Sequence, residues 1–168
     1  RCFLNEYTFV QELSSKAFCS VNLYVDKHNK AYSVKEITRQ AIAKRAILDG
    51  AILKNLRHPN IIQLFEIIDD TNTACIYFVQ EFVDHRGTLL SLDSLGRAKG
   101  DALDEATCHK YFQQVFAGLE YLHSNNVVHR DIQPGTIFVD SATSTVKLSG
   151  FDLTTLFHGH DDSMQNVE

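Results

Sequence analysis

Apolar and β-branched residues near the N-terminus gather in three short segments, at residues 7–13, 18–25 and 31–37. Aromatic and β-branched side chains favour strands, so each segment is predicted to form one. The polar stretch 26–30 lies between the second and third segments and has the composition of a turn. The pattern therefore predicts antiparallel hairpins in this part of the chain.

The spacing of apolar residues changes to the helical period over residues 38–56, which predicts a helix packed on the sheet. Pro59 ends this pattern, because proline has no amide hydrogen and disfavours a helical residue before it. Two further apolar segments, 61–68 and 74–82, flank the polar turn 69–73. The first half of the chain is thus predicted to contain five strands and one helix.

The second half has a different pattern. The leucines at 89, 90, 92 and 95 predict a short helix, and Asp104 is a candidate N-cap for a longer one with an apolar stripe. Short strands are predicted at 136–140 and 145–149. The change of pattern near residues 84–88 predicts two domains, a sheet-rich one at 1–83 and a helical one at 84–168.

Composition places the chain among soluble globular proteins, with 168 residues of which 44% are hydrophobic. Its 16 basic and 21 acidic residues give a net charge of −5 without a basic block, which argues against nucleic acid or an anionic membrane as partner. The four cysteines lie far apart, which disfavours zinc ligation and disulfides and favours a reducing, cytoplasmic setting. No apolar run approaches the roughly 20 residues of a membrane span. Because the chain starts at Arg1 and stops in a polar run, we expect a fragment of a longer protein.

One motif carries chemical information. Residues 129–134 read His-Arg-Asp-Ile-Gln-Pro, which resembles the H-R-D-L-K-P-x-N catalytic loop of eukaryotic protein kinases. Four more segments match that family in order. Residues 32–35, Tyr-Ser-Val-Lys, correspond to the family's V-A-I-K. Residues 52–61 correspond to the end of helix C, 80–83 to the interlobe hinge and 146–152 to the segment that holds D-F-G in the family. The resemblance implies an α+β, protein-kinase-like fold, with a five-stranded antiparallel N-lobe, helix C and the start of a helical C-lobe. It ends inside the activation segment.

The resemblance also implies roles for residues that match. Asp131 stands at the position of the base that accepts the substrate hydroxyl proton. Lys35 stands at the position that pairs the phosphates of ATP, with Asp49 in place of the usual glutamate; it is either a nucleotide ligand or a strand lysine that reaches solvent. The backbone of Glu81 and Val83 would meet adenine. The expected nucleotide-binding residues are Lys35, Glu81, Val83, Val21 and Ser33.

Several positions depart from the family pattern. Ser14, Lys16 and Cys19 replace the three glycines of the phosphate-binding loop, so an ordinary β-turn is expected there, with Lys16 at most a point charge near a phosphate. Gln133 replaces the catalytic-loop lysine. The two magnesium ligands are replaced by Thr136, in place of asparagine, and Gly150, in place of the D-F-G aspartate. A magnesium ion is therefore not expected, and no metal site is predicted.

Weaker metal candidates remain at three places. Thr136 could ligate a metal through its hydroxyl, and Asp152 could replace the missing carboxylate of position 150 after a local rearrangement. The stretch 158–162 contains two histidines and two aspartates, which suit either a metal site or, as we expect, a solvated loop.

These features lead to three hypotheses. The leading one is a pseudokinase that acts in binding, scaffolding or regulation, with weak or metal-independent binding of ATP and a protein partner or regulated kinase. The second is a serine/threonine protein kinase with atypical metal handling that uses Lys35 and Asp131. The third is a purely structural module of a larger protein, which needs neither nucleotide nor metal.

Overall fold

The computed structural model describes residues 3–40, 53–83, 89, 91–92, 98–99, 102–140, 142–151 and 155–156. The chain divides into two compact units. The first contains Arg1–His58 and Ile62–Arg86, and the second contains Pro59–Ile61 and Gly87–Glu168. The domain boundary expected between residues 83 and 84 stays a prediction.

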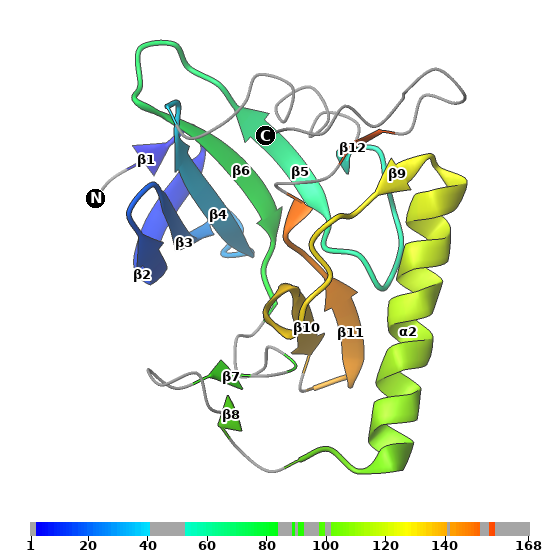
Figure 1. Ribbon diagram of the computed structural model, residues 1–168. Helices are drawn as coiled ribbons and strands as arrows, with labels where there is room; N and C mark the ends of the chain where they lie inside the picture. The colour runs from blue at the N-terminus through cyan, green and yellow to red at the C-terminus, as the bar shows by residue number, and fades with distance from the viewer. Residues whose placement is uncertain are drawn as a thin grey trace. The chain divides into compact units, whose positions relative to one another are not determined.

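The first unit is built on an antiparallel sheet with the strand order β1-β2-β3-β4-β6-β5 (Figure 1). The five predicted strands are present, and a two-residue strand, β1, adds to the edge beside β2. The bounds are β1 (Phe3–Leu4), β2 (Tyr7–Lys16), β3 (Cys19–Val25), β4 (Ala31–Thr38), β5 (Leu64–Ile68) and β6 (Cys75–Glu81).

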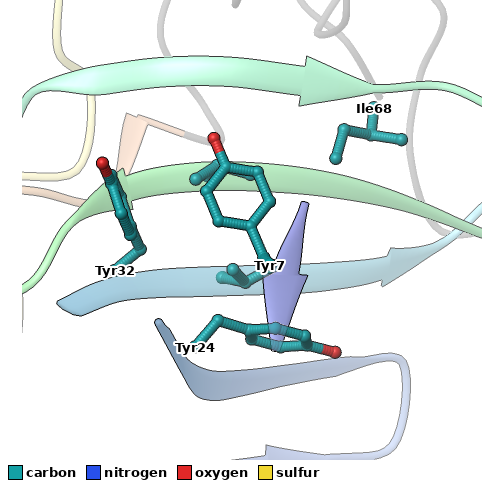
Figure 2. Close-up of a cluster of buried hydrophobic side chains, with 6 residues drawn as sticks. Tyr7, Tyr24, Tyr32 and Ile68 are labelled. Carbon is teal, nitrogen blue, oxygen red and sulfur yellow. The ribbon is translucent and has the colours of Figure 1, made fainter. Parts of the chain in front are cut away.

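One face of this sheet buries a cluster rich in tyrosine, and Figure 2 shows three of its rings together. The rings of Tyr7 and Tyr32 meet edge to face at 5.2 Å. Each hydroxyl donates to a carboxylate, because a buried hydroxyl without a partner is costly. The pairs are Tyr7 to Glu66 at 3.3 Å, Tyr24 to Glu36 at 3.3 Å and Tyr32 to Asp26 at 3.2 Å. Val34, Ile68 and Val79 complete the cluster.

Most of the predicted helix at 38–56 lies outside the described residues, as does Asp49. At its end, Leu53 is helical and buried, and Leu56 is buried. The short helix predicted around residues 89–95 is wrong, because Ser91–Leu92 forms strand β7, which pairs with β8 (Ala98–Lys99). Pairing with a second strand satisfies backbone groups that so short a helix would leave exposed.

The second unit contains one long helix, α2 (Glu105–Ser124), which begins as predicted. The side chain of Asp104 accepts a hydrogen bond from the Thr107 amide at 2.8 Å, which is the N-cap interaction. Strands β10 (Ile137–Asp140) and β11 (Thr145–Leu148) form the predicted hairpin. Strand β9 (Val127–Val128) pairs with β12 (Thr155–Leu156), and a 3₁₀ turn spans Pro134–Thr136. No helix among the described residues is long and apolar enough to cross a membrane.

Asn60 joins three segments of the second unit. Its buried Nδ2 donates to the Val146 carbonyl at 2.9 Å and to Oε1 of Gln114 on α2 at 3.0 Å. Its own carbonyl accepts the amide of Leu148 at 2.9 Å, and Ile61 forms a bridge with Leu148. This pairing explains why β5 starts at Leu64 and not at residue 61 as predicted.

Candidate functional site

The loop after β9 turns around a buried histidine. His129 is only 1% exposed, and its Nδ1 accepts a hydrogen bond from the Asp131 amide at 3.2 Å. Since Nδ1 is an acceptor, the proton lies on Nε2, which donates to the Ser149 carbonyl at 2.8 Å. The ring also lies 5.0 Å from that of Phe151. The histidine thus holds the 129–131 turn against the 149–151 segment.

Asp131 lies two residues after His129, and Arg130 between them has a positive φ of 66°. Its Oδ1 accepts a hydrogen bond from Nε2 of Gln133 at 2.7 Å, and its backbone carbonyl accepts one from the Thr136 hydroxyl at 2.7 Å. The loop therefore brings together the three predicted positions 131, 133 and 136. A neutral amide, and no cation, faces the Asp131 carboxylate from position 133.

The Thr136 hydroxyl is hydrogen-bonded inside this loop. It lies 2.7 Å from the Asp131 carbonyl and 3.0 Å from the Gln133 carbonyl, and it accepts the Gln133 amide at 3.2 Å. The Thr136 carbonyl accepts the Ser149 amide at 2.8 Å, which ties the loop to the strand segment before Gly150. These bonds make Thr136 the residue that fixes the shape of the 131–136 loop.

Gly150 lies against Thr136 with a positive φ of 84°. A Cβ placed on Gly150 would lie 2.5 Å from Cγ2 of Thr136 and 3.5 Å from Oδ2 of Asp131. The first distance is far below a van der Waals contact, so the Thr136 methyl group occupies the space that a side chain at position 150 would enter. The resemblance makes positions 136 and 150 the two magnesium ligands of the family, but the sequence does not show that the Thr136 methyl group fills the space beside Gly150.

These residues do not fit the magnesium ion that a kinase-like loop implies. Magnesium takes hard oxygen ligands, mainly carboxylates and water. Position 150 offers no side chain, and the hydroxyl of Thr136 is hydrogen-bonded to the carbonyls of Asp131 and Gln133. In the part of the chain that the structure describes, no three His, Cys, Asp or Glu residues gather as a metal would require. Asp152 and residues 158–162 lie outside that part.

In the first unit, the predicted nucleotide-binding side chains share one face of the sheet. Val21 on β3 is the direct partner of Lys35 on β4, and Ser33 is two residues before Lys35. Residues two apart on a strand point to the same side. This face is opposite to the one that carries Tyr32 and Val34, which belong to the tyrosine cluster. The register therefore groups Val21, Ser33 and Lys35 on one surface of two neighbouring strands.

The two predicted backbone positions are the last residue of β6, Glu81, and a residue just beyond it, Val83. The Glu81 amide donates to the Gln63 carbonyl at 2.8 Å, and the Glu81 side chain accepts the Gln63 amide at 3.2 Å. The amide of Glu81 is thus engaged inside the sheet and is not the group that would meet adenine. Val83 follows two residues later and is buried.

The hairpin between β2 and β3 lacks the open glycine loop of a phosphate site. The strands stay paired through Ser14↔Val21 and Ser15↔Ser20 to Lys16↔Cys19, so only residues 17 and 18 form the turn. The expected β-turn is confirmed. Backbone amides in a paired hairpin are directed along the sheet and do not converge on an anion as they do in a nest.

Comparison with known proteins places these features in context. The family model described as "Protein kinase domain" matches residues 7–168. The serine/threonine-protein kinase GRIK1 of Arabidopsis thaliana is 35% identical over 174 residues, which cover 96% of this chain and 42% of that protein. The calcium/calmodulin-dependent protein kinase kinase of Caenorhabditis elegans is 38% identical over 136 residues, which cover 81% of this chain and 23% of that protein.

A solved structure supports the fold. The crystal structure of Rad53 1-466 in complex with AMP-PNP matches with a TM-score of 0.71 at 24% identity, over 88% of this chain and 38% of that one. The chain spans about two fifths of the length of GRIK1, its relative in Arabidopsis. The family-model match at residues 7–168 includes strands β2 to β6, the helix α2 and the loop around Asp131.

Proposed function

Because this chain belongs to the protein kinase family, we propose that it is a pseudokinase domain, used for binding, scaffolding or regulation and not for magnesium-dependent phosphoryl transfer. The observation that carries the proposal is the filled loop around Thr136. Its hydroxyl bonds to the loop's own carbonyls, and its methyl group takes the side-chain space of Gly150. Position 150 therefore has no side-chain oxygen, and position 136 has only a neutral hydroxyl that is already engaged in the loop.

The chemistry of phosphoryl transfer explains why these positions matter. Catalysis depends on positioning the nucleotide and on neutralising the charge of its phosphates. A metal clamp contributes several kcal/mol, so its loss is expected to slow transfer by roughly a thousandfold or more. Gln133 is expected to slow transfer further, because a neutral amide stands beside the Asp131 carboxylate where the family has a lysine. Asp131 could still accept a hydroxyl proton, but the charge on the phosphates would remain.

Nucleotide binding is a separate question from catalysis. The shared face of Val21, Ser33 and Lys35 offers an apolar contact, a hydroxyl and an ammonium group to a nucleotide. The paired β2–β3 hairpin does not add a nest of amides for the phosphates. We propose that ATP binds weakly and without a metal ion, with Lys35 as the cation that meets the phosphates.

The proposed partner is another protein. The nematode relative is, by its name, a kinase that acts on a protein kinase. We propose that this chain likewise meets a protein kinase, which it binds or regulates. The net charge of −5 without a basic block gives no support for a nucleic-acid partner.

Retention of Asp131 favours a second candidate, a serine/threonine protein kinase with atypical metal handling. The carboxylate is held by Gln133 in a defined position, and the relatives described above are named as serine/threonine or protein kinases. This candidate requires a cation ligand other than positions 136 and 150.

A thermal-shift titration of the full protein tests the proposal. ATP is added with and without MgCl₂ to the wild type and to Lys35→Ala. We expect a small shift that MgCl₂ does not increase and that Lys35→Ala abolishes. A shift that appears only with MgCl₂ would favour the active-kinase candidate, and no shift with any nucleotide would favour a purely structural module.

A further inference from the structure

Thr136 and Gly150, which replace the two magnesium ligands of the family, are also in steric contact with each other. Gly150 and Thr136 are fourteen positions apart in the sequence but in direct contact in the second unit. A Cβ on Gly150 would lie 2.5 Å from Cγ2 and 3.1 Å from Cβ of Thr136. Any side chain at position 150 must therefore displace the methyl group of Thr136 first.

The methyl group has little freedom to move. Threonine is branched at Cβ, so rotation about χ1 moves the methyl and the hydroxyl together. The hydroxyl lies 2.7 Å from the Asp131 carbonyl and accepts the Gln133 amide at 3.2 Å. Rotation of the methyl away from Gly150 would break these bonds, which hold the loop around Asp131.

A carboxylate at position 150 would meet a second obstacle. Oδ2 of Asp131 is 3.5 Å from the Cβ position, so two carboxylates would lie close together. Like charges at this distance repel unless a cation lies between them. The backbone φ of 84° adds strain for any residue other than glycine, although asparagine and aspartate tolerate this region better than most.

From this geometry we infer that Thr136 is the residue that keeps a metal-ligating side chain out of position 150, so that the two replaced positions form one interlocked pair. The inference rests on the proposed function, which explains why a site without metal ligands persists. It adds that a single Gly150→Asp substitution does not restore a metal site, because Thr136 must change as well.

The test is a double-mutant cycle in the full protein, measured as the thermal midpoint without nucleotide or metal. Gly150→Ala adds the Cβ, and Thr136→Ser removes Cγ2 but keeps the hydroxyl. In the wild-type background, Gly150→Ala is expected to lower Tm by roughly 5 °C or more, from overpacking and backbone strain together. In the Thr136→Ser background the loss is expected to fall to about half or less, because only the strain of positive φ remains.

Gly135→Ala is the matched control. It lies in the same loop, and apart from its chain neighbours no atom lies within 4 Å of the Cβ it would add. Its effect on Tm is expected to be small and equal in both backgrounds. If Gly150→Ala costs the same with threonine and with serine at position 136, the interlock does not exist and the inference is overturned.

Gly150→Asp provides the second arm. We expect no rise in Tm on addition of MnCl₂ to this single variant, and a Mn²⁺-dependent rise in Gly150→Asp alone overturns the inference, since the carboxylate would then fit beside threonine. Failure of the proposed function looks different, because it would appear as magnesium-dependent phosphoryl transfer by the wild type. The stability cycle is independent of that result.

Discussion

The Thr136 hydroxyl gives a prediction that separates its hydrogen bonds from its methyl group. Thr136→Val keeps the shape of the side chain and the methyl contact with Gly150 but removes the oxygen. Three interactions are lost: those with the Asp131 and Gln133 carbonyls at 2.7 and 3.0 Å, and the one from the Gln133 amide at 3.2 Å. The backbone then keeps donors and acceptors without these partners.

The expected loss in the free energy of unfolding depends on how exposed this loop is. A net hydrogen bond contributes about 0.5–1.5 kcal/mol, and a single hydroxyl proton cannot serve both carbonyls at once, so two effective bonds are lost. Gln133 is exposed and Thr136 half-buried, which lets water replace part of the loss. We therefore expect Thr136→Val to lower the free energy of unfolding by about 1–2 kcal/mol.

Urea denaturation of the full protein measures this change. Thr143→Val is the matched control, because its exposed hydroxyl bonds side chains of the β10–β11 turn, Thr145 at 2.9 Å and Asp140. It is expected to change the free energy of unfolding by less than about 0.5 kcal/mol. Equal effects of the two substitutions would refute the idea that Thr136 fixes the loop.

Two further predictions concern the cores of the two units. Asn60→Ala removes a buried donor to the Val146 carbonyl and should lower the free energy of unfolding, measured with urea, by about 2–4 kcal/mol. The control Asn72→Ala, in an exposed turn, should lower it by less than about 1 kcal/mol. Similar losses in the two variants would contradict the anchoring role of Asn60. Burial and the neighbouring Glu66 carboxylate raise the pKa of Tyr7 to about 12. In the unfolded chain a tyrosine loses its proton near pH 10, so the unfolded state binds fewer protons between about pH 10 and 12, and stability falls as pH rises through this range. Tyr7→Phe should make that fall shallower, and an unchanged pH dependence would show that Tyr7 does not titrate in this way.

The sequence predicted the elements whose signals are local. Aromatic and β-branched runs indicated the five long strands, and Asp104 indicated the start of α2, because both depend on neighbouring residues. The prediction of a short helix around Leu92 was wrong because the structure there depends on residues further along the chain. Its formation as a strand depends on pairing with Ala98–Lys99, which an apolar spacing alone does not reveal.

The candidate site shows the same division. The resemblance of residues 129–136 to the kinase catalytic loop located Asp131, Gln133 and Thr136, and the structure brings them together. It could not show that Thr136 fills the space beside Gly150, since that contact depends on how two distant segments pack. The hydrogen bond from Asn60 to the Val146 carbonyl, 86 positions away, was not predicted for the same reason.

A phosphotransfer assay tests the central claim most directly. The full protein is incubated with γ-labelled ATP, MgCl₂ and a general protein substrate, beside the Asp131→Asn variant. If the chain is the pseudokinase proposed above, incorporation of label by the wild type will be no greater than by Asp131→Asn. Robust magnesium-dependent transfer that Asp131→Asn abolishes would contradict that proposal.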